Sequence, residues 1–204
     1  MNSLRRELLG EQLPAIRMMV PAGWVVVPVD ESGVAEFVDA IRARSREAGR
    51  PDIEAAFASS VSRWLTELRL HGGRCAVLPL DPPEGTALPL SFAVSIIEGA
   101  AGSGLEEWVT AKIRAGGTSF LDDRRSVLSW RTSTTGTGAM EGTVTDHYHY
   151  LIPVPGTQRK AAARLAGSHV LDAEGLTAGD PRREAAAALF DAMALTVDWP
   201  PAAR

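Results

Sequence analysis

The stretch Glu141–Pro155, EGTVTDHYHYLIPVP, carries the strongest structural signal in this sequence. From Val144 to Val154 the even-numbered positions are largely apolar, whereas the odd-numbered positions are mostly polar. Because successive side chains of a strand point to opposite faces, this alternation predicts a long strand with one face in a core. It also places His147 and His149 on the same polar face, about 6.6 Å apart along the strand.

The His147/His149 pair is the only pattern in the sequence that indicates chemistry. Two imidazoles on one strand face can form half of a zinc or iron site, which needs at least a third ligand. His169, on a neighbouring predicted strand, is the plausible third histidine. The alternative, which we favour, is that both are surface histidines in contact with water or with hydrogen-bond partners. We therefore expect no bound metal and no cofactor.

The remaining segments alternate between helical and strand periodicity. Predicted strands cover residues 15–20, 24–29, 74–80, 88–96, 124–131, 140–154 and 161–170, and predicted helices cover 34–48, 52–70, 105–113 and 180–197. Helices fall between groups of strands rather than after each strand. This order predicts an α+β fold in which an antiparallel β-sheet is flanked by helices, instead of a doubly wound parallel sheet.

The domain organisation reads as a single domain over residues 1–204, because no long linker divides the sequence. Residues 1–13 could add a short amphipathic helix, with Leu4, Leu8 and Leu9 on one side. A helix of this length is marginal alone and needs a surface to pack on. That surface could belong to its own domain, to a second copy or to a partner, so these leucines are candidate partner-binding residues.

Composition excludes several classes of function. The net charge of −4, with no basic cluster, argues against binding to nucleic acid or to an anionic membrane. No apolar run approaches the roughly 18 to 20 residues of a membrane span, and no signal peptide is visible. The single cysteine, Cys75, permits no internal disulfide and is expected to be a buried, inert thiol. We expect a soluble, cytoplasmic protein.

Catalytic motifs are missing from the sequence. There is no G-x-S-x-G elbow, and the glycine-rich segment Ala101–Gly104 lacks the spacing of a phosphate-binding loop. The tryptophans are spread along the chain, and Trp64 and Trp108 fall on apolar helix faces that we expect in the core. We also expect four further aromatic side chains to be mostly buried: Phe57, Phe92, Tyr148 and Phe190.

Three further segments resemble the PsbP-like superfamily. They are VPAGWVVVP at residues 20–28, YHYLIPVPG at residues 148–156, and ALFDAM at residues 188–193 followed by Trp199. The resemblance, which extends to actinobacterial proteins of unassigned role, implies an α/β/α sandwich around an antiparallel sheet. It carries over no catalytic residues, because the understood members of this fold mostly act in binding or assembly.

The sequence therefore favours a non-enzymatic binding or accessory protein whose partner is another protein, and it is compatible with a homo-oligomer. One alternative is a metal-dependent enzyme or metal-binding domain built on His147 and His149. Another is a small-molecule binding domain that uses a cleft between sheet and helices.

Overall fold

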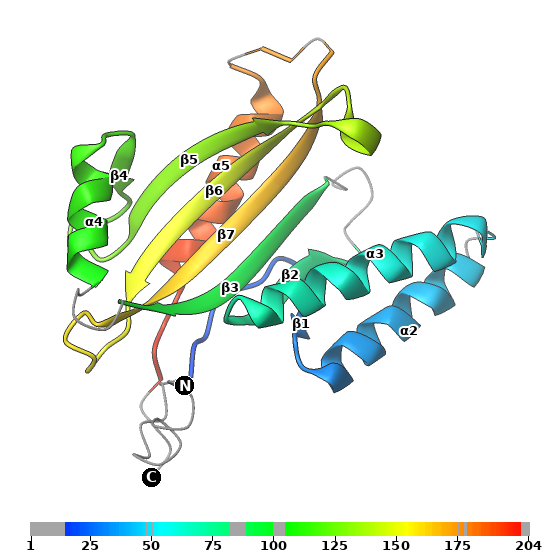
Figure 1. Ribbon diagram of the computed structural model, residues 1–204, viewed down its shortest axis with the longest axis horizontal. Helices are drawn as coiled ribbons and strands as arrows, with labels where there is room; N and C mark the ends of the chain where they lie inside the picture. Colours follow the sequence, from blue (N-terminus) through cyan, green and yellow to red (C-terminus); the bar gives the residue numbers. More distant parts are fainter. Residues whose placement is uncertain are drawn as a thin grey trace.

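The fold is built on one antiparallel sheet of seven strands, in the order β1-β2-β3-β7-β6-β5-β4 (Figure 1). The computed structural model describes residues 15–47, 49, 51–81, 89–99, 105–174, 176–177 and 179–200. The strands are Trp24–Pro28 (β1), Gly73–Pro79 (β2), Leu90–Glu98 (β3), Thr118–Phe120 (β4), Leu128–Thr135 (β5), Thr143–Pro153 (β6) and Ala161–Asp172 (β7). The helices are Glu31–Glu47 (α2), Pro51–Leu70 (α3), Leu105–Arg114 (α4) and Pro181–Leu195 (α5), with a short 3-10 turn at Gly138–Met140.

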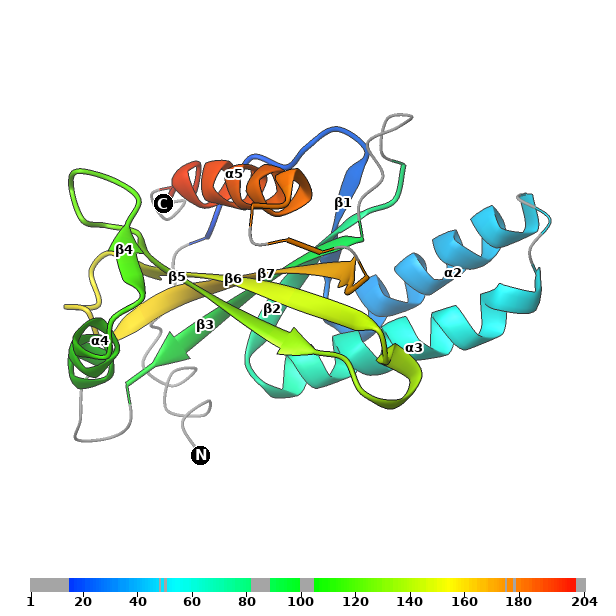
Figure 2. The same ribbon diagram turned by 90° about the horizontal axis from the view of Figure 1, so that it is seen from above.

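Helices lie on both faces of the sheet, with α5 on one side and α2, α3 and α4 on the other (Figure 2). The predicted α+β class with an antiparallel sheet between helices is therefore confirmed. The two strands with the clearest alternation, β3 and β6, belong to the same sheet, and β7 pairs with both of them.

The main core lies between α5 and the centre of the sheet. Phe190 of α5 is fully buried, and its ring contacts those of Phe92 and Tyr148, with centroids 5.4 and 5.2 Å apart. Gly167 of β7 makes this approach possible, because a Cβ there would lie 2.7 Å from the Phe190 ring. Asp180 begins α5 by accepting a hydrogen bond from the backbone N–H of Arg182.

On the opposite face of the sheet, the described helices cover only the two ends. The pair α2 and α3 packs on β1 and β2 through a core that includes Phe37, Ile41 and Leu65. At the other end, α4 packs Leu105 and Val109 against β5 and β6. The strands between these two helix contacts carry the side chains of the candidate site.

Several predicted details are wrong. Residues 15–20 form only an isolated antiparallel bridge between Arg17 and Asp198, because they run along the α5 side and pair with the chain after α5. The strand predicted at 124–131 begins at Leu128 and continues to Thr135 through residues expected to be loop. The strand Thr118–Phe120 was not predicted, because three residues are too few to show an alternation.

The expected burial of aromatic side chains is confirmed at Phe92, Tyr148 and Phe190. It is wrong at Trp64 and Trp108, which are 37% and 45% exposed. Trp64 lines a pocket beside α3, and Trp108 meets Trp130 only edge-on. Phe57 was also expected to be buried, but its side chain lies outside the described part. Among the described residues, no helix is long and apolar enough to cross a membrane.

Candidate functional site

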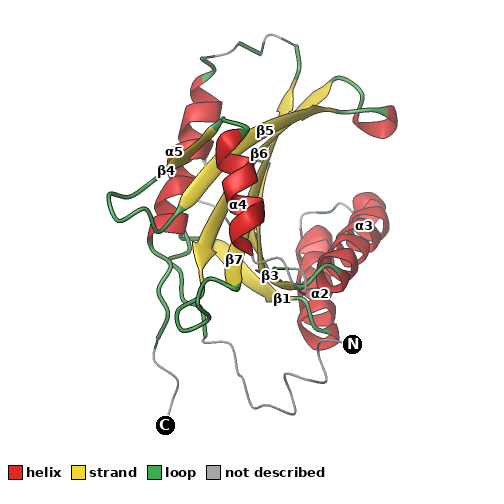
Figure 3. Cartoon of the chain, turned by 60° about the vertical axis from the view of Figure 1, so that its left-hand side comes forward, coloured by secondary structure: helices red, strands yellow, loops and turns green. Residues whose placement is uncertain are grey.

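The candidate site is the uncovered strip of sheet between α4 and the α2–α3 pair, here called the open face (Figure 3). Its side chains come from the central strands and alternate with the residues buried under α5. They are Ser91, Ala93 and Ser95 of β3, Thr132 and Thr134 of β5, Thr145, His147 and His149 of β6, and Arg164, Ala166, Ser168 and Val170 of β7. These side chains are half-buried or exposed, and no described helix covers them.

The sheet register decides how His147 is held. Thr134 Oγ1 lies 3.1 Å from its Nε2, and Ser168 Oγ lies 3.3 Å from its Nδ1. Both partners come from the strands on either side, so the imidazole is fixed across three strands. With hydroxyl partners on both sides, the ring can be accommodated in either neutral tautomer.

His149 is held on one side only. Its Nε2 lies 3.3 Å from Thr132 Oγ1, whereas Nδ1 is buried without a hydrogen-bond partner among the described residues. A buried polar atom with no partner costs free energy, so the protein tolerates a local loss of stability at this nitrogen.

Aromatic rings continue the histidine pair into a row along the open face. The imidazoles of His147 and His149 stack with centroids 6.1 Å apart, and His149 stacks on Trp130 at 5.0 Å. Trp108 of α4 meets Trp130 edge-on at 5.7 Å, and Lys112 Nζ lies 5.3 Å from the centre of the Trp130 ring. This row joins the open face to α4.

The electrostatic environment of the row is basic. The pKa of His149 is lowered to about 4, first by burial of the imidazole, which disfavours its charged form. Three basic side chains act in the same direction: Arg164, His147 and Lys112. His149 is therefore neutral at physiological pH, and the field around it favours a negative group.

The geometry bears on the metal hypothesis. The shared face of His147 and His149 is as predicted, but their rings lie nearly parallel, 20° apart, instead of converging on one point. His169 lies opposite Asp146 in the register of β6 with β7, so its side chain faces α5 on the other side of the sheet. Among the described residues, no three His, Cys, Asp or Glu side chains lie close enough together to hold a metal ion.

A buried polar cluster lies under the start of α5, where the sequence showed no signal. Asp146 Oδ1 accepts hydrogen bonds from Arg183 Nη2 at 3.0 Å and Ser133 Oγ at 2.6 Å. The Tyr148 hydroxyl donates to the Arg183 carbonyl at 3.1 Å. His169 is fully buried beside this cluster, and burial lowers its pKa. These contacts join α5 to the sheet, so we assign them a structural role.

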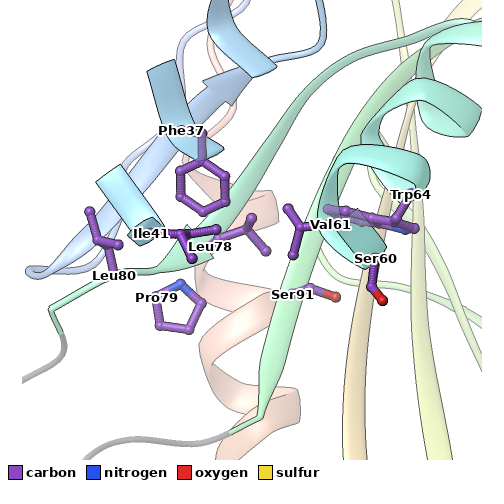
Figure 4. A pocket seen from close by; sticks show the side chains of 9 residues that line it. All are labelled: Phe37, Ile41, Ser60, Val61, Trp64, Leu78, Pro79, Leu80 and Ser91. Atoms are coloured by element: carbon purple, nitrogen blue, oxygen red, sulfur yellow. The ribbon is translucent and has the colours of Figure 1, made fainter. Parts of the chain in front are cut away.

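An apolar pocket of about 350 Å³ lies between the α2–α3 pair and the sheet (Figure 4). Its walls are mostly aliphatic and aromatic, with two hydroxyls: Phe37, Ile41, Ser60, Val61, Trp64, Leu78, Pro79, Leu80 and Ser91. The sequence allowed a cleft between sheet and helices as one alternative, but it did not identify this lining, because the residues come from four separate segments. Its volume is at the lower end of the range for small-molecule sites.

Among the other sequence candidates, only Cys75 lies in the described part of the chain, and it is not part of the open face. Cys75 is half-buried in β2, and burial raises its pKa to about 11, in agreement with an unreactive thiol. Leu4, Leu8 and Leu9 lie outside the described residues, and so does the glycine-rich segment Ala101–Gly104.

Comparison with known proteins gives few matches. No protein-family model and no curated protein matches the chain. A mutant of the protein Mog1 is similar in structure, with a TM-score of 0.41 and 13% identity over 61% of this chain and 78% of the other. The Ran-binding protein Mog1p of Saccharomyces cerevisiae has a TM-score of 0.39 and 14% identity over the same shares. Both likenesses are too weak to assign this chain to a family or to transfer a partner.

Proposed function

We propose that the chain is a non-enzymatic, cytoplasmic accessory protein that binds another protein through the open face. The observation that carries this proposal is that the described helices cover the two faces of the sheet to different extents. One face is buried under α5, whereas the central strands of the other keep half-exposed hydroxyl and imidazole groups between two helical walls.

The chemistry of the open face supports binding more than catalysis. General acid–base or nucleophilic chemistry needs a reactive group and a partner that activates it within hydrogen-bond reach. Within the described part of the chain, the ring nitrogens of His147 and His149 instead form hydrogen bonds only with serine and threonine hydroxyls, and no carboxylate orients either ring. Such groups can recognise a ligand by hydrogen bonds and stacking.

The proposal is tested by a bulky substitution on the open face. Ser168→Tyr places a ring beside His147. Its control, Leu195→Tyr, introduces the same residue at a half-exposed position at the end of α5. Proteins captured from the native host by the wild-type chain are identified by mass spectrometry. We expect at least one to be lost with Ser168→Tyr and retained with Leu195→Tyr. Equal capture by all three proteins would refute the open face as the binding surface.

The apolar pocket favours a second candidate, a small-molecule binding function. Because Trp64 lines the pocket, an apolar ligand with one hydrogen-bonding group should change its fluorescence. A Val61→Trp substitution would fill the space and abolish the response, whereas Trp108 should keep its emission. No change in Trp64 fluorescence across a panel of such ligands would argue against this function.

A further inference from the structure

The charges on the open face differ from those of the whole chain. The chain has 25 acidic against 21 basic residues. On the open face, by contrast, the charged and titratable side chains are Arg164, His147 and His149, and the residues defining it include no carboxylate. The first acidic residue further along this side of β7 is Asp172, the last residue of the strand.

Lys112 adds a fourth basic group at the α4 edge of this surface. Its position over Trp130 brings it close enough to lower the pKa of His149. Arg164 on β7 and His147 on the same strand lower that pKa as well. Basic groups thus reach the imidazole from β6, β7 and α4, while β5 contributes only Trp130 and Thr132. Acidic groups are absent from the influences on its pKa.

A negative group bound here would be complementary to this surface. It would offset the repulsion among the basic side chains, which are held near one another by the fold. A basic partner would instead add to that repulsion.

We propose that the open face recognises an acidic segment of its partner protein, rich in Asp or Glu, with Arg164, Lys112 and the two histidines as the recognising groups. This inference rests on the proposed binding function of the same face and specifies the chemistry of the partner. Hydroxyls along β3, β5 and β7 supply further hydrogen bonds to the backbone of the segment. The specificity then comes from charge, and the affinity decreases with salt.

The test uses the full chain and two labelled ten-residue peptides, (Glu-Ser)5 and its neutral counterpart (Gln-Ser)5, in fluorescence anisotropy titrations. We expect only the acidic peptide to bind, with affinity falling at least about tenfold between 50 and 300 mM NaCl. The double substitution Arg164→Glu/Lys112→Glu should reduce binding at least about tenfold. Arg164→Gln, which removes one charge without adding another, should give an intermediate loss.

The matched control is Arg17→Glu. Arg17 is an exposed arginine on the α5 side that pairs with Asp198 at 3.7 Å. Its replacement by glutamate makes the net charge more negative by two units, half the change in the double variant, and leaves the open face unaltered. Its affinity for (Glu-Ser)5 should stay within about twofold of the wild type, and circular dichroism should show that all variants are folded.

Three results would overturn the inference: equal binding of both peptides, unchanged affinity of the Arg164→Glu/Lys112→Glu protein, or an equal loss with Arg17→Glu. If a captured partner is sensitive to Ser168→Tyr but no acidic peptide binds, the acidic specificity is refuted and the binding surface stands. If the acidic peptide binds with the expected charge dependence but no capture depends on Ser168, recognition of acidic segments is supported and the proposed accessory function is refuted.

Discussion

Replacing Gly167 by alanine tests the packing of α5 on the sheet. An added Cβ would lie 2.7, 2.8 and 2.9 Å from three carbons of the Phe190 ring. Carbon atoms pack best at about 3.5 to 4.0 Å, so the ring must move by roughly 1 Å. It has little freedom to do so, because Phe92 and Tyr148 contact it as well. We expect Gly167→Ala to lower the free energy of unfolding by roughly 1–3 kcal/mol, the usual cost of overpacking.

A double-mutant cycle separates this steric effect from a general loss of strand stability. Phe190→Ala alone should cost roughly 3–5 kcal/mol, because it leaves a cavity at a fully buried position. In the double variant the new methyl group enters the vacated space. The combined loss should therefore be smaller than the sum of the single losses by roughly 1–2 kcal/mol.

The measurement is urea unfolding followed by far-ultraviolet circular dichroism, with the denaturant slope compared among variants. The control is Gly179→Ala, at a glycine where an added Cβ meets nothing within 4 Å. That change should be neutral or stabilising by up to about 1 kcal/mol. A neutral Gly167→Ala, or strictly additive losses in the cycle, would refute the close approach of α5 to β7.

Further predictions concern individual side chains. Asp146→Asn should lower the free energy of unfolding, measured with urea, by about 3 kcal/mol. This is the lower end for a broken buried ion pair, because the Arg183 side chain keeps 26% exposure. A loss below about 1 kcal/mol would contradict a stabilising role for the pair. Protein purified without a histidine tag should hold no stoichiometric zinc, iron or manganese by elemental analysis, and one equivalent that disappears in the His147→Ala/His149→Ala variant would reverse that expectation. Alkylation of Cys75 at pH 8 should be roughly a hundredfold slower in the folded than in the urea-unfolded protein, since burial raises the pKa of its thiol to about 11; equal rates would place the thiol in solvent. The contribution of His149 to stability should be complete above about pH 6.5 and decrease toward pH 4. Between these values the imidazole is protonated in the unfolded chain but stays neutral in the folded protein, where its pKa is about 4. Replacing His149 by glutamine should flatten this part of the stability profile, and an unchanged profile would show that other groups cause it.

The amino-acid sequence by itself determined the features that depend on local periodicity. The alternation from Leu90 to Ile96 and from Thr143 to Val154 correctly predicted two strands with one buried face, because neighbouring side chains of a strand alternate whatever the rest of the chain does. The same rule placed His147 and His149 together. The start of α5 at Asp180 and Pro181 is likewise a local feature, since capping and a fixed proline φ act within one turn.

Only the tertiary structure decided which side chains meet across strands and layers. Trp130 stacks on His149 because the register of β5 with β6 sets them opposite each other, and neither residue's neighbours in sequence contain that information. Asp146 belonged to an apolar face by periodicity, yet it pairs with Arg183, 37 residues away. Trp64 lies on an apolar helix face, yet it is 37% exposed because it lines the pocket between α3 and the sheet. Register and layer packing are set by contacts distant in sequence, which no local pattern encodes.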